Sequence, residues 1–135
     1  MCGICGIFDL NGMPVSHQIL DAMTNSIRHR GPDGDGRYVD REVGLGHRRL
    51  SIIDVGGGGQ PISDEDGKLQ IVFNGEIYNF IELRKELEAF GHVFKTKSDT
   101  EVIVHAYEQW GTDCVKRFNG MFAFAIWDAR KREVF

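Results

Sequence analysis

Short apolar segments, separated by glycine turns and by helix-capping residues, run through the whole chain and indicate a domain that mixes strands with helices. Strands are expected at residues 4–10, 37–40, 43–53, 69–75 and 122–128, the last of them buried. A turn at 128–132 then leads into residues 133–135, where the chain stops inside an expected strand. Because an exposed, half-finished strand is a poor natural boundary, we expect a fragment of a longer protein.

Three helices are expected where a capping residue precedes an apolar repeat. Ser16 is predicted to cap the first, and two capping boxes, Asn79 with Glu82 and Ser98 with Glu101, predict the others. The first is expected to run to about residue 28 and the second to residue 91. The expected buried faces are Ile19, Met23 and Ile27 in the first helix, Leu83, Leu87 and Phe90 in the second, and Ile103, Ala106, Tyr107 and Trp110 in the third.

The composition restricts the class of protein. With 135 residues the chain forms one domain, which can bury roughly two-thirds of the surface of the unfolded chain. An apolar content of 41% and a charged content of 27% are typical of globular proteins. The net charge of −4, with acids and bases interleaved, argues against nucleic-acid binding. Neither a membrane-spanning run of about 20 apolar residues nor a signal peptide is present, so we expect a cytoplasmic protein.

Cys2 has the most distinctive chemistry, because removal of the initiator methionine would make it the N-terminal residue. Its free α-amine would then titrate at about 7.7–8.0, near the pH at which a general base works best. Processed Cys2 would therefore combine a thiol nucleophile and a general base in one residue. The alternative is an ordinary second residue with no catalytic role.

Six sequence blocks occur together in one order. They are MCGICGIFD (1–9), RHRGPDG (28–34), GHRRLSIID (46–54), VFNGEIYNF (72–80), KSDTEVI (97–103) and NGMFAFAIWD (119–128). This set resembles the N-terminal glutaminase domain of the glutamine-hydrolysing asparagine synthetases, which are class II glutamine amidotransferases among the N-terminal-nucleophile hydrolases. The resemblance covers residues 1–135. It implies an α+β fold, a four-layer α/β/β/α sandwich with two mostly antiparallel sheets.

The resemblance implies a role for each block. Cys2 would attack the side-chain amide of L-glutamine and release ammonia, and water would then hydrolyse the glutamyl thioester to glutamate. Asn74 and Gly75 match the oxyanion-hole positions, through the side-chain NH₂ and the backbone N–H. Taken alone, Asn-Gly after an apolar run indicates a hairpin turn. We therefore expect the turn and the oxyanion hole to be the same feature.

Glutamine itself requires a cation for its α-carboxylate and an anion for its α-ammonium. By the resemblance, Arg49 pairs with the carboxylate through its guanidinium fork, and Asp99 receives the ammonium. Glu76 matches a further contact, and backbone groups around Ile52 would complete the site. An acid at position 99 is equally typical of a helix's first turn, and both roles are compatible. Spacing alone does not separate Arg48 from Arg49; the RLSI block selects Arg49.

The role of Arg30, in the RHRGPD block, stays open between two interpretations. A turn at Gly31 and Pro32, with Asp33 bonding its own backbone, would make the block structural. In the family this block lies near the nucleophile, so Arg30 would support the site electrostatically.

Other motifs carry less weight. The histidines, at positions 17, 29, 47, 92 and 105, are scattered, so we predict no metal site. The glycines at 56–59 precede Gln60 and Pro61, unlike a phosphate-binding loop. By resemblance they belong to a mobile loop that covers glutamine.

We therefore expect an enzyme that needs no cofactor for glutamine hydrolysis. Its partner in the family is a C-terminal synthetase domain, absent from this sequence, that uses ATP and Mg²⁺ to amidate aspartate. A homodimer is compatible with the resemblance. One alternative is a regulatory module that binds glutamine through Arg49 and Asp99 without turnover. Another is a CxxC redox protein, which predicts a disulfide between Cys2 and Cys5.

Overall fold

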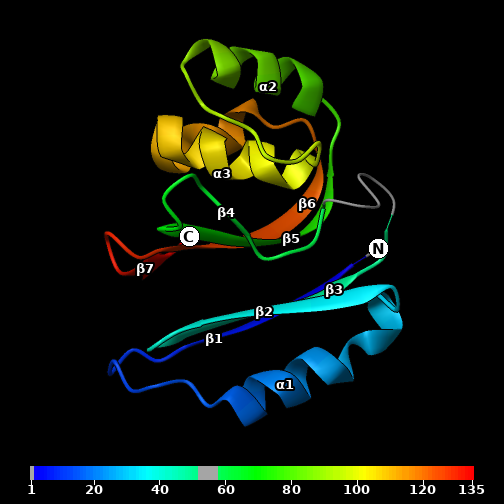
Figure 1. Cartoon of the computed structure of the whole chain (residues 1–135), viewed down its shortest axis with the longest axis vertical. Helices are drawn as coiled ribbons and strands as arrows, with labels where there is room; N and C mark the ends of the chain where they lie inside the picture. The colour runs from blue at the N-terminus through cyan, green and yellow to red at the C-terminus, as the bar shows by residue number, and fades with distance from the viewer. Residues whose placement is uncertain (1, 52–57) are drawn as a thin grey trace.

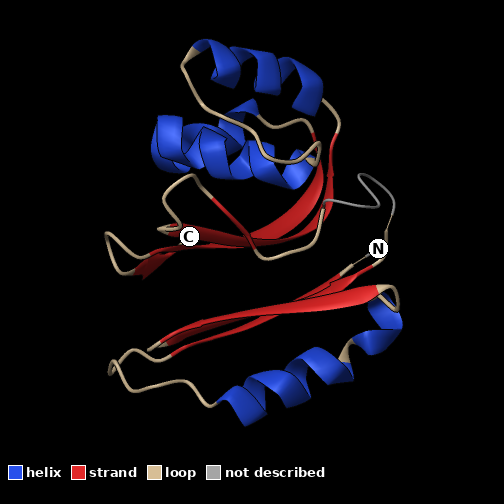
Figure 2. Cartoon of the chain, viewed as in Figure 1, coloured by secondary structure: helices blue, strands red, loops and turns tan. Residues whose placement is uncertain are grey.

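Two antiparallel sheets face each other between helical layers in the computed structural model, which describes residues 2–51 and 58–135 (Figures 1 and 2). The elements are β1 (Gly3–Phe8), α1 (His17–Ser26), a 3₁₀ helix (Arg28–Arg30), β2 (Gly34–Asp40), β3 (Val43–Arg49), β4 (Ile62–Ser63), β5 (Leu69–Ile77), α2 (Phe80–Ala89), α3 (Asp99–Trp110), a further 3₁₀ helix (Gly111–Arg117), β6 (Gly120–Asp128) and β7 (Glu133–Val134). Within the described ranges, every helix is too short or too polar to cross a membrane.

The strand order is β1–β3–β2 in the first sheet and β4–β5–β6–β7 in the second. All paired strands are antiparallel. Helix α1 covers the outer face of the first sheet, whereas α3 packs on the outer face of the second, with α2 beyond it (Figure 1). The layers therefore follow the order α/β/β/α, which confirms the predicted α+β sandwich.

Helix α1 begins as predicted, but its buried face is centred on other residues than predicted. The hydroxyl of Ser16 accepts the N–H of Ile19 at 3.4 Å, so it caps the helix. The buried residues are Leu20 and Thr24, whereas Ile19, from the predicted face, is 56% exposed. Helical spacing fits both sets equally, since each repeats every four residues. The prediction was therefore wrong for Ile19, whereas Met23 and Ile27 are half-buried.

Glycines in β3 decide which face of α1 is buried. A β carbon at Gly46 would lie 2.4 Å from Thr24 Oγ1 and 2.6 Å from Cys5 Sγ. At Gly44 it would lie 3.2 Å from the Leu20 side chain. Because these strand positions lack side chains, Leu20 and Thr24 can pack closely against the sheet. The small residues of the strand thus select the helix face.

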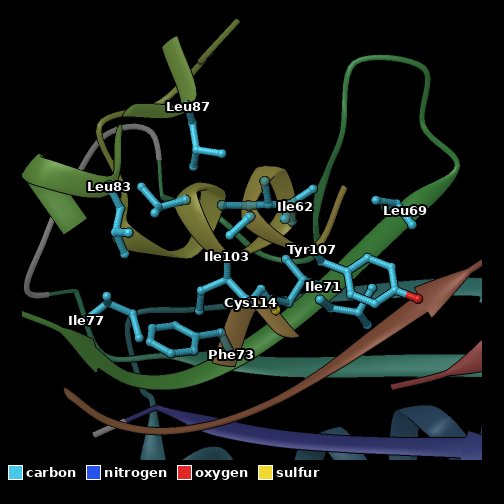
Figure 3. Packing of buried hydrophobic residues seen from close by; sticks show 14 residues of the cluster. Ile62, Leu69, Ile71, Phe73, Ile77, Leu83, Leu87, Ile103, Tyr107 and Cys114 are labelled. Carbon is cyan, nitrogen blue, oxygen red and sulfur yellow. The ribbon is translucent and has the colours of Figure 1, made fainter. Parts of the chain in front are cut away.

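The main core lies between the second sheet and its helices, where side chains of α2, α3 and β5 point toward one another (Figure 3). Its fully or nearly fully buried members are Ile62, Leu69, Ile71, Phe73, Ile77, Leu83, Leu87, Val102, Ile103, Val104, Ala106, Tyr107, Cys114 and Ile126. Phe90 was predicted to be buried with Leu83 and Leu87 but is 57% exposed. It lies just after α2 and contacts Trp110 edge-on, with ring centroids 6.3 Å apart.

Neither predicted capping box forms in full. Asn79 precedes α2, but its side chain makes no cap and instead accepts the Asn119 N–H at 2.9 Å. Ser98 does cap α3, since its hydroxyl accepts the Thr100 N–H at 3.1 Å. Glu101 does not complete that box. Its carboxylate reaches further back, to the N–H of Lys95 at 2.8 Å.

A smaller core fills the space between the two sheets. It consists of Val43, Leu45, Val72 and Trp127. Strand β6 was predicted to be buried throughout 122–128, but Phe122 is 36% exposed and Met121 before it is 64% exposed. Only the last three residues of this strand, Ile126 to Asp128, are buried.

Candidate active site

A pocket of about 290 Å³ opens beside Cys2, where the end of β3, the end of β5 and the start of α3 meet. The residues that line it are Cys2, Arg49, Leu50, Gly58, Gln60, Phe73, Asn74, Gly75, Glu76, Ser98, Asp99, Thr100 and Met121. The structure therefore brings together six predicted site residues from four separate parts of the sequence. A concave site with a few converging polar groups is the usual form of a small-molecule site.

Cys2 directly precedes β1 and is half-buried at the pocket wall. Its Sγ accepts the backbone N–H of Leu50 at 3.3 Å and lies 3.6 Å from the Leu50 carbonyl oxygen, to which the thiol can donate. These contacts attach the thiol to the chain that follows β3. Arg49, the last residue of β3, consequently lines the same pocket as the sulfur atom.

Asn74 and Gly75 lie inside β5, where they pair with Ala123 and Phe122 of β6. The predicted hairpin turn at Asn-Gly is therefore wrong, because β5 continues to Ile77. Gly75 has φ +154°, and a β carbon there would lie 2.1 Å from the Met121 carbonyl oxygen. Only glycine fits this position, since any side chain would collide with the neighbouring strand.

The side chain of Asn74 lines the pocket beside Gly75. Among the described residues, its Oδ1 is buried and has no hydrogen-bond partner. Buried polar atoms normally have partners, and exceptions tend to occur at functional sites. A side-chain amide in this position can donate N–H groups to a developing oxyanion.

The two neighbouring arginines have different environments. Arg48 is 7% exposed and faces α1, where its Nε donates to the Thr24 carbonyl at 3.0 Å and its Nη1 contacts Asp35 at 3.2 Å. Its Nη2 also donates to Asn25 Oδ1. Arg49 lines the pocket instead. The alternation of side chains along β3 thus separates a structural arginine from one that can face a ligand.

Asp99, the first residue of α3, is 4% exposed at the pocket. Its Oδ2 accepts the Ile77 N–H at 3.0 Å. Burial raises the pKa of Asp99 above its ordinary value, and the nearby charge of Glu76 raises it further, against the opposing effect of backbone hydrogen bonds. A cationic ligand group would relieve both effects, so the carboxylate is suited to an ammonium.

Arg30 lies next to this site but does not line it. A β carbon at Gly3 would lie 3.1 Å from Arg30 Cβ, so the arginine packs directly against the residue after Cys2. Its neighbour Gly31 approaches the backbone of Arg48 equally closely, since a β carbon there would lie 2.4 Å from the Arg48 carbonyl carbon. These contacts support the structural interpretation of the RHRGPD block.

Gln60 lines the pocket and was not predicted to belong to the site. Its Oε1 accepts the Phe73 N–H at 2.6 Å, and its Nε2 donates to Thr100 Oγ1 at 3.2 Å. This side chain therefore joins β5 to the start of α3. Local sequence carries no signal for such a role, because both partners are remote in the chain.

Two predictions fall wholly or partly outside the described residues. Ile52, which was expected to contribute backbone groups to the glutamine site, is outside the described residues. Glycines 56 and 57 of the expected covering loop are also outside them. Gly58, the next residue, is buried and lines the pocket.

The cysteines argue against the redox alternative. Cys2, Cys5 and Cys114 are all free thiols. Cys5 Sγ lies 3.5 Å from Thr24 Oγ1, on the α1 side of the sheet. The disulfide predicted for a CxxC redox protein does not form.

A family model described as the glutamine amidotransferase domain matches residues 1–135. The chain belongs to this family. The amidotransferase domain is 50% identical over 131 residues to asparagine synthetase (glutamine-hydrolysing) 1 of Bacillus subtilis strain 168, covering 95% of this chain and 21% of that protein. It is 40% identical over 131 residues to asparagine synthetase (glutamine-hydrolysing) 1 of Arabidopsis thaliana, covering 96% and 22%. The chain thus spans about a fifth of the length of these relatives.

Solved structures extend the comparison to the fold of the amidotransferase domain. A glutamine phosphoribosylpyrophosphate amidotransferase from B. subtilis matches with a TM-score of 0.75 and 25% identity, covering 93% of this chain and 35% of that one. A structure described as the allosteric regulatory enzyme of purine biosynthesis matches with a TM-score of 0.73 and 27% identity, covering 91% and 34%. The fold is that of the N-terminal-nucleophile hydrolases, as the sequence blocks predicted.

Proposed function

We propose that this domain hydrolyses the side-chain amide of L-glutamine at Cys2. The observation that supports the proposal most strongly is the single pocket that holds a thiol, an amide with an unpartnered oxygen, an arginine and a buried carboxylate. Arg49 would bind the α-carboxylate of glutamine, and Asp99, with Glu76 nearby, would bind its α-ammonium. The side-chain amide of the substrate would then reach Cys2.

The reaction proceeds through two tetrahedral intermediates. Cys2 Sγ forms a bond to the amide carbon, and the carbonyl oxygen becomes an oxyanion that Asn74 and Gly75 stabilise by N–H donation. Cleavage of the C–N bond releases ammonia, whose extra proton comes from the α-amine that deprotonated the thiol. Water then attacks the thioester, and Cys2 leaves as the product glutamate forms. This chemistry requires a free Cys2 amine and no metal or cofactor.

The fate of the ammonia is the second part of the proposal. Relatives that share 40% and 50% of these residues carry the name of glutamine-hydrolysing asparagine synthetases. We infer that the domain works within a longer cytoplasmic protein, in which a synthetase domain uses ATP and Mg²⁺ to amidate aspartate. The coupling of glutamine hydrolysis to amidation of aspartate would be tested by joining the chain to such a domain and measuring glutamine-dependent asparagine formation.

Covalent labelling tests the first part directly. The purified chain is treated with diazo-oxo-norleucine, a glutamine analogue with an electrophilic carbon, and its intact mass is measured before and after. We expect one adduct on a chain that lacks methionine, and none on Cys2→Ala. Labelling at Cys5 or Cys114 would contradict the proposal. A processed chain that binds glutamine without an adduct or turnover would instead establish the regulatory-module alternative.

A further inference from the structure

Four side chains with metal-binding groups meet outside the glutamine pocket, on the side of the domain formed by α2 and α3. Glu65 comes from the segment between β4 and β5, and His92 comes from the segment between α2 and α3. His105 and Glu108 lie one turn apart on α3. One ligand atom from each residue lies within 4.8 Å of all the others. The sequence conceals this group, because its members are up to 43 residues apart.

The distances between these atoms match the edges of a tetrahedral metal site. Zinc bonds of about 2.0–2.2 Å to nitrogen and oxygen require ligand atoms about 3.3–3.6 Å apart. His92 Nδ1 lies 3.3 Å from Glu108 Oε2, and His105 Nδ1 lies 3.5 Å from Glu65 Oε2 and 3.6 Å from Glu108 Oε2. The other carboxylate oxygen of Glu65, Oε1, lies 3.9 Å from His92 Nδ1. Three nitrogen–oxygen distances therefore already fit a tetrahedral site, and all four ligand atoms lie within 4.8 Å of one another, so the longer separations would shorten as the ion binds.

The buried imidazole of His105 has ring nitrogens without hydrogen-bond partners among the described residues. The residue is 1% exposed. Leaving such buried polar groups unpaired destabilises the folded state. Nδ1 is directed at the two carboxylates of the cluster, at distances longer than a hydrogen bond. A cation between them would satisfy the nitrogen and both oxygens.

The outer contacts of both histidines follow the pattern of metal sites, in which the second ring nitrogen faces an oxygen acceptor. His92 Nε2 lies 3.1 Å from Gln109 Oε1. His105 Nε2 lies 3.7 Å from Glu101 Oε1. Glu101 is 1% exposed and is itself held by the N–H groups of Lys95 and Thr96 at 2.8 and 2.7 Å. Each Nδ1 is thereby directed toward the cluster.

We propose that Glu65, His92, His105 and Glu108 form a binding site for a divalent transition metal ion, with Zn²⁺ as the ion that fits best. Two imidazoles and two carboxylates supply a neutral-plus-anionic ligand set that favours Zn²⁺ over Mg²⁺ or Ca²⁺, which prefer oxygen ligands alone. The site is structural. It joins the segment before β5 and the segment before α3 to α3 itself, the helix that begins with Asp99 of the glutamine pocket.

A surface depression of about 400 Å³, lined by Glu65, His92 and Glu108 among others, provides access for the ion. This inference does not depend on the proposed glutaminase reaction, since no member of the cluster lines the pocket of Cys2. The competing interpretation is a metal-free cluster in which protonated histidines pair with the carboxylates. The two interpretations differ in whether the chain takes up a metal ion.

Cobalt titration of the chelator-treated chain tests the proposal without reference to activity. We expect one equivalent of Co²⁺ to produce the visible absorption of a four-coordinate site, and Zn²⁺ to remove it by displacement. Thiolate charge-transfer absorption in the near ultraviolet should be absent, because the site contains no sulfur. Such absorption would instead place the ion at Cys2 and Cys5 and overturn the assignment.

Glu108→Gln and His92→Ala are the test variants, because both side chains are partly accessible and neither belongs to the core. We expect each to weaken Co²⁺ and Zn²⁺ binding at least about 100-fold, since loss of even an outer partner costs about 10–100-fold. Glu82→Gln, on the exposed side of α2, and His17→Ala, at the start of α1, are the matched controls and should bind like the parent.

Thermal unfolding provides a second readout. Zn²⁺ at about 100 times its dissociation constant should raise the melting temperature of the parent by an amount on the order of 10 °C, and should leave Glu108→Gln nearly unchanged. Failure of the parent to bind one equivalent of metal, or equal binding by parent and test variants, would overturn the proposal and establish the ion-pair interpretation.

Discussion

The Oδ2 atom of Asp99 accepts the backbone N–H of Ile77 at 3.0 Å, which joins the first residue of α3 to the last residue of β5. The same strand carries Asn74 and Gly75, three and two residues earlier. A single hydrogen bond therefore connects the proposed ammonium site to the strand of the proposed oxyanion hole. Gln60 reinforces this connection from the other side, between Phe73 and Thr100.

Asn74→Ala is expected to reduce kcat for glutamine hydrolysis by about 10²–10³-fold, the typical cost of one lost oxyanion donor. Its stability should change little, because Asn74 Oδ1 makes no hydrogen bond within the described residues. Steady-state ammonia release and urea unfolding would measure the two effects, with exposed Asn11→Ala as the control. A kcat within a factor of two of the parent would remove Asn74 from the mechanism.

Arg48 and Arg49 should respond oppositely to substitution. Arg49→Lys loses a planar two-point contact with the glutamine carboxylate, so KM should rise about 10–100-fold. Arg48→Gln removes the bond to Thr24 and the ion pair with Asp35, and should cost about 1–3 kcal/mol of stability with a smaller change in KM. Kinetics and urea unfolding on both variants would measure this. The reverse pattern would mean that Arg48 binds substrate.

Asp99→Asn should weaken glutamine binding without loss of stability at pH 7. Because the pKa of Asp99 is raised by burial, the folded state binds its proton more tightly than the unfolded state. The ionised carboxylate therefore costs folding free energy above the raised pKa, and this cost vanishes as pH falls below the ordinary value of about 3.9. The amide of Asn can still accept the Ile77 N–H.

Urea unfolding of parent and Asp99→Asn at pH 7 and near pH 4 measures that linkage. We expect the variant to be at least as stable as the parent at pH 7 and to lose this advantage at the lower pH. KM for glutamine should rise at least about tenfold at pH 7, because the variant loses the charged contact with the substrate ammonium. A variant that is clearly less stable at pH 7 would show that the carboxylate stabilises the fold.

His47 should make stability depend on pH below neutrality. It is 1% exposed between the sheets, and burial lowers its pKa to about 4. The unfolded chain, with an ordinary value of about 6.5, therefore takes up the proton first as pH falls. The free energy of unfolding should therefore be highest near pH 7 with respect to His47 and should fall by about 2 kcal/mol by pH 5.

The comparison with His47→Gln isolates this contribution, because all other titrating groups, Asp99 included, are common to both chains. We expect the difference in unfolding free energy between parent and variant to shift by about 2 kcal/mol between pH 7 and pH 5, measured by urea titration. A difference that does not vary with pH would mean that the pKa of His47 is the same in the folded and unfolded states.

Local sequence was a reliable guide where a short-range hydrogen bond decides the outcome. Ser16 and Ser98 start their helices as predicted, because a hydroxyl can cap only the few residues that follow it. Local sequence was a poor guide where a long-range contact competes with a local one. Asn79 could have capped α2, but Asn119 lies close enough to occupy its side-chain oxygen. Asn-Gly at 74–75 could have formed a turn, but pairing with β6 keeps it in a strand.

The sequence by itself determined the family, through six ordered blocks, and with it the list of residues for the site. Only the tertiary structure decided how they are used. Strand alternation directs Arg48 to α1 and leaves Arg49 at the pocket. Packing of remote segments brought Gln60 to the pocket and placed His92 beside His105, with ring centroids 5.1 Å apart. Side-chain direction and long-range proximity arise from sheet pairing and core packing, which no local pattern encodes.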